Sequence, residues 1–133
     1  MISIDTNVLV RLLIVDDEKQ CGAARALVES NRVLIARTVL LECEWVLRSR
    51  FKLDRKLIHR FFEGLCETSG IEIEAESATR RAVDAYGKGV DFADALHATA
   101  SPHLFRTFDA KLVRQRRRVT GAEIAGVPVA RKR

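Results

Sequence analysis

Residues 1–13, MISIDTNVLVRLL, place an aspartate between two apolar segments. Residues 2–4 are short and apolar, which predicts a strand buried on both faces, and the segment that follows Asn7 predicts a helix. Asp5 therefore lies where a strand ends and a helix begins. Burying a carboxylate beside a core is costly unless a helix N-terminus, a cation or a metal compensates it. The rest of the sequence must indicate which of these applies.

The alternation of strand and helix continues along the chain. Short apolar segments at residues 32–36, 71–75, 103–108 and 127–129 predict further strands, with longer helical patterns between them. This order is typical of an α/β protein with a parallel sheet covered by helices. The strictly alternating IEIEA at 71–75 predicts a strand with one solvated face, and hence an edge position.

Capping residues mark several helix starts. Asp16 or Asp17 precedes one helical pattern and Asp54 precedes another, while Thr38 is the expected cap of the segment TVLLECEWVLRS. The pattern that begins near residue 76 is expected to end at Gly87 or Gly89, since a left-handed C-terminal residue suits glycine.

Composition predicts one soluble domain spanning residues 1–133. The chain is 47% hydrophobic and 31% charged, and no apolar stretch is long enough for a membrane span. Because the sequence enters a predicted strand without a leader-like segment, we expect a cytoplasmic location. The three cysteines have neither disulfide nor zinc spacing and are predicted to be reduced core thiols.

Positive charge is concentrated in a basic C-terminal tail. Residues 106–133 contain nine Lys or Arg and two acids, a net charge of +7, whereas the whole chain carries +5 and the remainder therefore −2. Such a cluster favours a polyanionic partner, although a solvated face or a disordered tail explains it equally well.

Acidic residues follow two of the predicted strands. Asp5 ends the first strand and Asp109 ends the fourth, and ligands of open parallel sheets collect at the C-terminal ends of strands. The alternative is that each aspartate only caps the helix after it. Asp91 and Asp94 likewise fit an N-cap and third helical residue, yet their spacing also allows both carboxylates to project toward the sheet rim.

Glu42 and Glu44 fall on opposite sides of a predicted helix. Glu44 precedes Arg48 by four residues, the spacing of an exposed salt bridge. Glu42 has apolar neighbours and no basic residue one turn away, so a site role is favoured. Several converging carboxylates need a cation to remain ionised, and an all-oxygen donor set suits Mg²⁺ or Mn²⁺.

Four segments resemble, in order and spacing, the acidic motifs of PIN-domain ribonucleases, most closely the VapC toxins of bacterial toxin–antitoxin pairs: ISIDTNVLVRLL, TVLLECEWVLRS, DFADALHATA and TFDAKL. The resemblance implies a three-layer α/β/α sandwich with a parallel sheet of about five strands. It also implies a Mg²⁺- or Mn²⁺-dependent endoribonuclease, a cognate antitoxin and a homodimer.

The same resemblance assigns roles to individual residues. The family's acids fall on Asp5, Glu42, Asp94 and Asp109 as catalytic residues. Metal ligands would be Asp5, Asp94 and Asp109, with Asp91 as a further candidate. Supporting groups would be Thr6, Asn7 and Thr107. RNA phosphates would be attracted by Arg114, Arg116, Arg117 and Arg118.

Two other functions remain open at this point. A metal-dependent phosphohydrolase also places an aspartate after its first strand, but usually shows a second one two residues later, where this chain has Asn7. A non-catalytic RNA-binding protein would need the basic tail but not Glu42.

Overall fold

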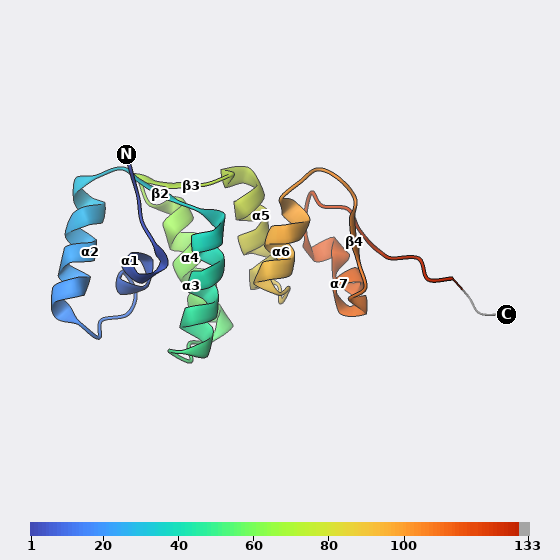
Figure 1. The fold of residues 1–133 in the computed structure, drawn as a ribbon, viewed down its shortest axis with the longest axis horizontal. Coiled ribbons are helices and arrows are strands. Elements are labelled where there is room, and N and C mark those ends of the chain that lie inside the picture. The colour runs from blue at the N-terminus through green and yellow to red at the C-terminus, as the bar shows by residue number, and fades with distance from the viewer. Residues whose placement is uncertain (131–133) are drawn as a thin grey trace.

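A computed structural model describes residues 1–130 (Figure 1). Five strands occur in this range: β1 (Ile2–Ser3), β2 (Val33–Ile35), β3 (Ile71–Ile73), β4 (Phe105–Thr107) and β5 (Ile124–Gly126). The α-helices are α1 (Thr6–Arg11), α2 (Glu18–Ser30), α3 (Arg37–Ser49), α4 (Arg55–Glu67), α5 (Glu76–Gly87), α6 (Phe92–Thr99) and α7 (Ala110–Arg114). A 3₁₀-helix, η1, covers Arg116–Arg118. The last three residues of the predicted basic tail, 131–133, lie outside the described residues.

All the strand pairs are parallel, and helices flank them, which confirms the α/β class. The strands are divided between two sheets, one with the order β1-β2-β3 and one formed by β4 and β5. β3 lies at the edge of the first sheet, as its alternating sequence predicts. In Figure 1, α5 and α6 lie between the first sheet and β4, so the protein is elongated.

The fifth strand lies earlier than the sequence predicts. It covers Ile124–Gly126 rather than residues 127–129, so that prediction was wrong. Pairing with β4 fixes its position: the N–H of Phe105 donates to the Glu123 carbonyl at 2.8 Å, and Val127 donates to the Thr107 carbonyl at 3.0 Å. Pro128 follows directly and has no N–H with which to continue a ladder.

The helix starts are mostly local features. Asp17 accepts the Gln20 N–H at 3.1 Å and Asp54 accepts the Leu57 N–H at 2.9 Å, which confirms both caps. Thr38 is not a cap, because α3 begins one residue earlier, at Arg37. The Arg37 N–H instead donates to a carboxylate oxygen of Glu74, just beyond β3, at 2.9 Å. A residue that follows the neighbouring strand β3 thus caps α3.

An aromatic cluster occupies the core beside α6. The Phe62 ring centroid lies 5.1 Å from that of Phe92 and 6.3 Å from that of Tyr86, and all three side chains are fully buried. The cysteines are free, as predicted; two are buried, but Cys66 is partly exposed, because it lies near the end of α4. None of the helices in residues 1–130 is long and apolar enough to cross a membrane.

Candidate functional site

Asp5 and Glu42 face a common hollow in the surface. Asp5 is the N-cap of α1, and its carboxylate accepts the Val8 N–H at 3.0 Å. Glu42 projects from α3, and both acids are exposed to solvent. The hollow that they line also contains Asn7, and Thr6 contributes to it from the start of α1. The first two predicted catalytic acids and two predicted supporting residues therefore lie together.

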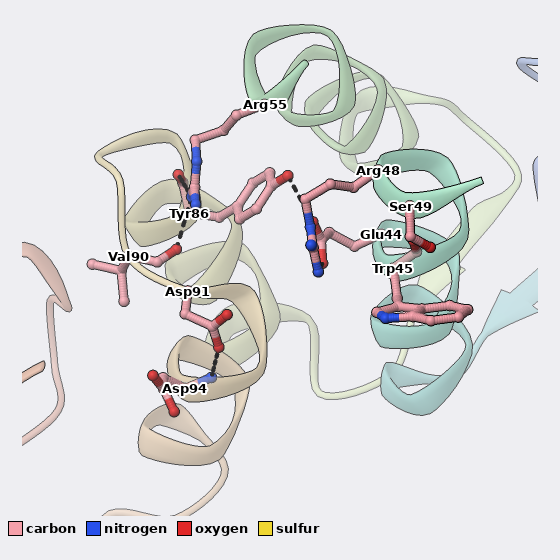
Figure 2. Close-up of polar contacts among 9 residues, drawn as sticks. All are labelled: Glu44, Trp45, Arg48, Ser49, Arg55, Tyr86, Val90, Asp91 and Asp94. Carbon is pink, nitrogen blue, oxygen red and sulfur yellow. Dashed lines mark hydrogen bonds and ion pairs between the residues drawn. The ribbon is translucent and has the colours of Figure 1, made fainter. Parts of the chain in front are cut away.

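A second group of acids surrounds the start of α6. The Asp91 carboxylate caps this helix by accepting the Asp94 N–H at 3.0 Å (Figure 2). Partial burial raises the pKa of Asp94, and the negative charges of Asp91 and Asp109 raise it further. These carboxylates are therefore close enough to repel one another, which is the situation that a bound cation relieves.

Asp109 is the N-cap of α7 and lies two residues after the end of β4. Its carboxylate accepts the N–H groups of Lys111 at 2.9 Å and of Leu112 at 3.2 Å. The Thr107 hydroxyl oxygen accepts the Asp109 N–H at 2.9 Å and so fixes the backbone of this acid. Thr107 thus lies where a supporting residue is expected.

A groove connects the two groups of acids. Glu42 lines it together with Asp91, and Trp45 and Arg48 from α3 form part of its wall. Glu42 therefore borders both the hollow at Asp5 and the groove at Asp91. The predicted acids follow one another along the surface but do not meet at a point. Within residues 1–130, no three acidic, histidine or cysteine side chains are close enough to hold a metal ion.

The chemistry of these donors nevertheless fits a hard divalent cation. Each aspartate cap uses a single carboxylate oxygen: Oδ1 of Asp5, Oδ2 of Asp91 and Oδ1 of Asp109. A carboxylate has about four acceptor positions, so capping leaves an oxygen available for an ion. The capping and metal-binding interpretations are therefore compatible. Oxygen donors of this kind suit Mg²⁺ or Mn²⁺.

Glu44 is buried, which corrects the prediction of an exposed residue. Its pairing with Arg48 is confirmed, since Arg48 Nε donates to Glu44 Oε2 at 2.8 Å. However, Glu44 is only 5% exposed and also accepts the Tyr86 hydroxyl at 3.1 Å (Figure 2). Burial and the nearby Glu44 charge raise the pKa of Tyr86, so its hydroxyl remains a donor. The spacing of residues within α3 does not predict that Tyr86 of α5 bonds to Glu44.

Arg55 connects the same tyrosine to the segment before Asp91. Its guanidinium lies 4.4 Å from the centroid of the Tyr86 ring. Its Nη1 donates to the Tyr86 carbonyl at 2.8 Å and to the Val90 carbonyl at 2.9 Å (Figure 2). Tyr86 and Arg55 were not predicted as site residues, and together they hold the backbone that positions Asp91.

Arg37 fixes α3 against α6. Its Nη2 donates to the Leu96 carbonyl and, at 3.1 Å, to the Thr99 hydroxyl, while Nη1 donates to Thr79 at 3.3 Å. Burial lowers the pKa of this guanidinium from its usual high value. The helix that carries Glu42 is thereby held against the helix that follows Asp91.

The four predicted RNA-contacting arginines are on α7 and η1, near Asp109 in the chain. Arg114, Arg116, Arg117 and Arg118 are all exposed. Two of them, Arg116 and Arg117, line a shallow hollow that extends to Leu104. The positively charged surface is thus formed by the segment that follows Asp109 in the chain.

A comparison with protein-family models matches residues 2–116 to the PIN domain. A search of curated proteins finds no significant match. The match to the PIN domain model covers most of the chain and includes all the predicted acids. The chain therefore belongs to the PIN domain family, whose members are generally metal-dependent nucleases that act on RNA.

Proposed function

We propose that this protein is a cytoplasmic endoribonuclease that uses Mg²⁺ or Mn²⁺ and acts as the toxin of a toxin–antitoxin pair. The observation that carries the nuclease proposal is the series of carboxylates from Asp5 and Glu42 to Asp91, Asp94 and Asp109 along one surface of a PIN-family chain. This series favours a nuclease over a purely RNA-binding protein, which has no use for clustered acids. The toxin role rests on the resemblance of the four acidic motifs to VapC proteins.

The proposed roles come from the resemblance of the four acidic motifs, and the positions of the side chains support part of them. Asp5, Glu42, Asp94 and Asp109 are the proposed catalytic acids, and Asp5, Asp91, Asp94 and Asp109 are the proposed ligands of the cation, which would have to draw them closer together than they lie in this structure. A divalent ion bound there supplies an activated water and neutralises charge on the phosphate. Thr107 orients Asp109 through its backbone, and Asn7 offers its amide to the hollow at Asp5. Thr6 is buried at the start of α1, between Asp5 and Asn7, and is the third proposed supporting residue.

The exposed arginines on α7 and η1 provide the RNA contact. Phosphates bind such side chains through charge, without reading the base sequence. Single-stranded RNA is the favoured substrate, because a flexible backbone is able to follow the groove beside Glu42. Binding at the arginines then brings the phosphodiester to the adjacent acids.

Metal binding is a direct test of the proposed site. We expect Mn²⁺ to bind in calorimetric titrations, EDTA to abolish RNA cleavage, and added Mn²⁺ or Mg²⁺ to restore it. Asp94→Asn removes a charged ligand and is expected to weaken Mn²⁺ binding by about 10-fold or more, roughly 1.4 kcal/mol. Asp84→Asn, on α5, removes an acid that pairs with Lys88 and serves as the matched control. Equal Mn²⁺ affinities of the two variants would contradict the assignment.

The toxin role is tested in living cells. Expression in a bacterium is expected to stop growth within a few generations, and Asp109→Asn is expected to relieve the arrest while the protein still accumulates. Co-expression of the cognate antitoxin, a protein that covers the acidic surface, should also restore growth. Growth that is unaffected by the active protein would refute the toxin role but not the nuclease activity.

A further inference from the structure

One face of α3 lines the groove beside Asp91 with three different kinds of side chain. Glu42 carries a negative charge, Trp45 an aromatic ring and Arg48 a positive charge, at intervals of three residues. On a helix this spacing places side chains on one face, about 5–6 Å apart between their Cβ atoms. Asp91 and Ala93, at the start of α6, also line the groove. An aromatic surface therefore lies one helical turn from a proposed catalytic acid.

The Trp45 ring is not part of the hydrophobic core. Trp45 is 55% exposed, whereas the nearby Tyr86 and Phe92 are fully buried. In Figure 2 the Trp45 ring lies outside the cluster formed by Glu44, Arg48 and Tyr86. Tryptophan is highly buried on average in folded proteins. The position of this ring in the groove leaves its π-face accessible to a ligand.

Arg48 is held in place at the end of the same face. Its Nε donates to Glu44 Oε2 at 2.8 Å, and its Nη2 donates to Glu44 Oε1 at 3.4 Å. Glu44 is itself fixed, because it is buried and accepts the Tyr86 hydroxyl at 3.1 Å. The Arg48 side chain nevertheless remains 51% exposed. A guanidinium that is fixed in position and still exposed is well suited to bind a phosphate.

The chemistry of the groove matches a nucleotide better than an apolar partner. Its volume is about 610 Å³, within the range of pockets that bind small organic ligands. An apolar segment lying there would leave the charges of Glu42, Arg48 and Asp91 unpaired, which is costly. A nucleotide instead offers a flat base to Trp45 and a phosphate to Arg48. The groove also continues into the hollow at Asp5, because Glu42 lines both.

We propose that the groove between α3 and the start of α6 binds one nucleotide of single-stranded RNA, whose base stacks on Trp45. The six residues from Glu42 to Arg48 rise about 9 Å along the helix, which leaves room for one nucleotide between its two flanking phosphates. One phosphate contacts Arg48, and the other reaches the acids beside Glu42. The position of the base next to the cleaved bond rests on the proposed nuclease function, but the stacking itself does not. Stacking tolerates every base, so the groove selects unpaired nucleotides rather than a sequence.

Intrinsic fluorescence tests the stacking directly. Trp45 is the single tryptophan of the chain, so its emission reports on this groove alone. The wild-type protein is titrated with a short oligoadenylate RNA, in EDTA and again in Ca²⁺, with selective excitation of tryptophan. We expect the RNA to quench the emission, because a stacked base lies in contact with the indole ring. An abasic strand of the same length carries the same phosphates without bases and should leave the emission unchanged. Equal quenching by both strands, or by neither, overturns the proposal.

Substitution of Trp45 tests how much the stacking contributes to affinity. Trp45→Ala is expected to raise the Kd of a fluorescein-labelled oligoadenylate by about 10-fold, the order of loss when one base loses its aromatic partner. Trp45→Phe keeps an aromatic face and should retain most of the affinity, and neither substitution should change the Kd of the abasic strand. Leu57→Ala truncates another exposed apolar side chain, on α4 and outside the groove, and is the matched control. Equal Kd values for Trp45→Ala and the wild type overturn the proposal.

The outcomes separate this proposal from the proposed nuclease function. Quenching by the oligoadenylate in a protein that cleaves no RNA would refute the nuclease function and leave the stacking site in place. RNA cleavage by Trp45→Ala with the wild-type KM would overturn the stacking site and leave the nuclease function in place. An emission that changes with protein concentration in the absence of RNA would show that a second copy covers the ring, and would also overturn the proposal.

Discussion

Asp5→Asn is expected to reduce RNA cleavage by about 100-fold or more, the loss that follows removal of one strong electrostatic group from an active site. Asparagine has nearly the same shape and is an equally good N-cap, so the bond from the Val8 N–H to residue 5 should persist. The substitution removes the charge needed to hold a cation and leaves the helix start in place. Single-turnover cleavage of a fluorescent RNA measures the loss, and circular dichroism measures the fold.

The matched control for this substitution is Asp17→Asn. Asp17 caps α2 through the same kind of bond, to the Gln20 N–H, but does not line the hollow that contains Asp5 and Glu42. We expect this variant to cleave RNA at the wild-type rate. If both variants lost activity equally, the loss would come from removing any N-cap charge of this kind, and not from a role of Asp5 in the site. If neither lost activity, the proposed catalytic function would be refuted.

Phe62→Ala is expected to lower the free energy of unfolding by about 3–5 kcal/mol, the usual cost of truncating a fully buried phenylalanine. The Phe62 ring is 1% exposed and packs against Phe92 and Tyr86. Phe92 is the first residue of α6, directly after Asp91. A cavity at this position therefore weakens the support of the second group of acids. Urea denaturation followed by circular dichroism measures the change.

Phe61→Ala provides the control on the same helix. Phe61 precedes Phe62, and its truncation to alanine removes the same number of atoms. The Phe61 side chain, however, is only partly buried. We expect a loss of about 1 kcal/mol, typical of a substitution outside the fully packed core. Similar losses for the two variants would contradict the assigned importance of the aromatic cluster.

Local sequence signals predicted much of the fold. An aspartate before a helical pattern is a short-range feature, since the side chain bonds to an N–H two or three residues later. Asp17 and Asp54 were therefore recognisable as caps, and Asp5, Asp91 and Asp109 were recognised as possible caps. Four of the five strands lie within their predicted ranges, because short apolar segments are equally local.

Features that depend on distant partners were not predictable in the same way. Glu44 has an arginine four residues later, which indicates an exposed pair, but Tyr86 from another helix completes its burial. The start of α3 depends on Glu74, which is 37 residues away in the sequence. The division of the strands into two sheets is likewise not indicated by the pattern of any one segment. The metal ligation by the predicted acids stays a prediction.

The Arg37 guanidinium links α3 to α5 and α6, and this affects how these helices unfold locally. It donates to the Leu96 carbonyl and the Thr99 hydroxyl on α6 and to Thr79 on α5, so α3, α5 and α6 share one half-buried donor. Amide protons of these helices should then exchange with solvent as one cooperative unit, rather than through fraying of each helix in turn. Glu42 and Asp94 consequently keep or lose their mutual arrangement together.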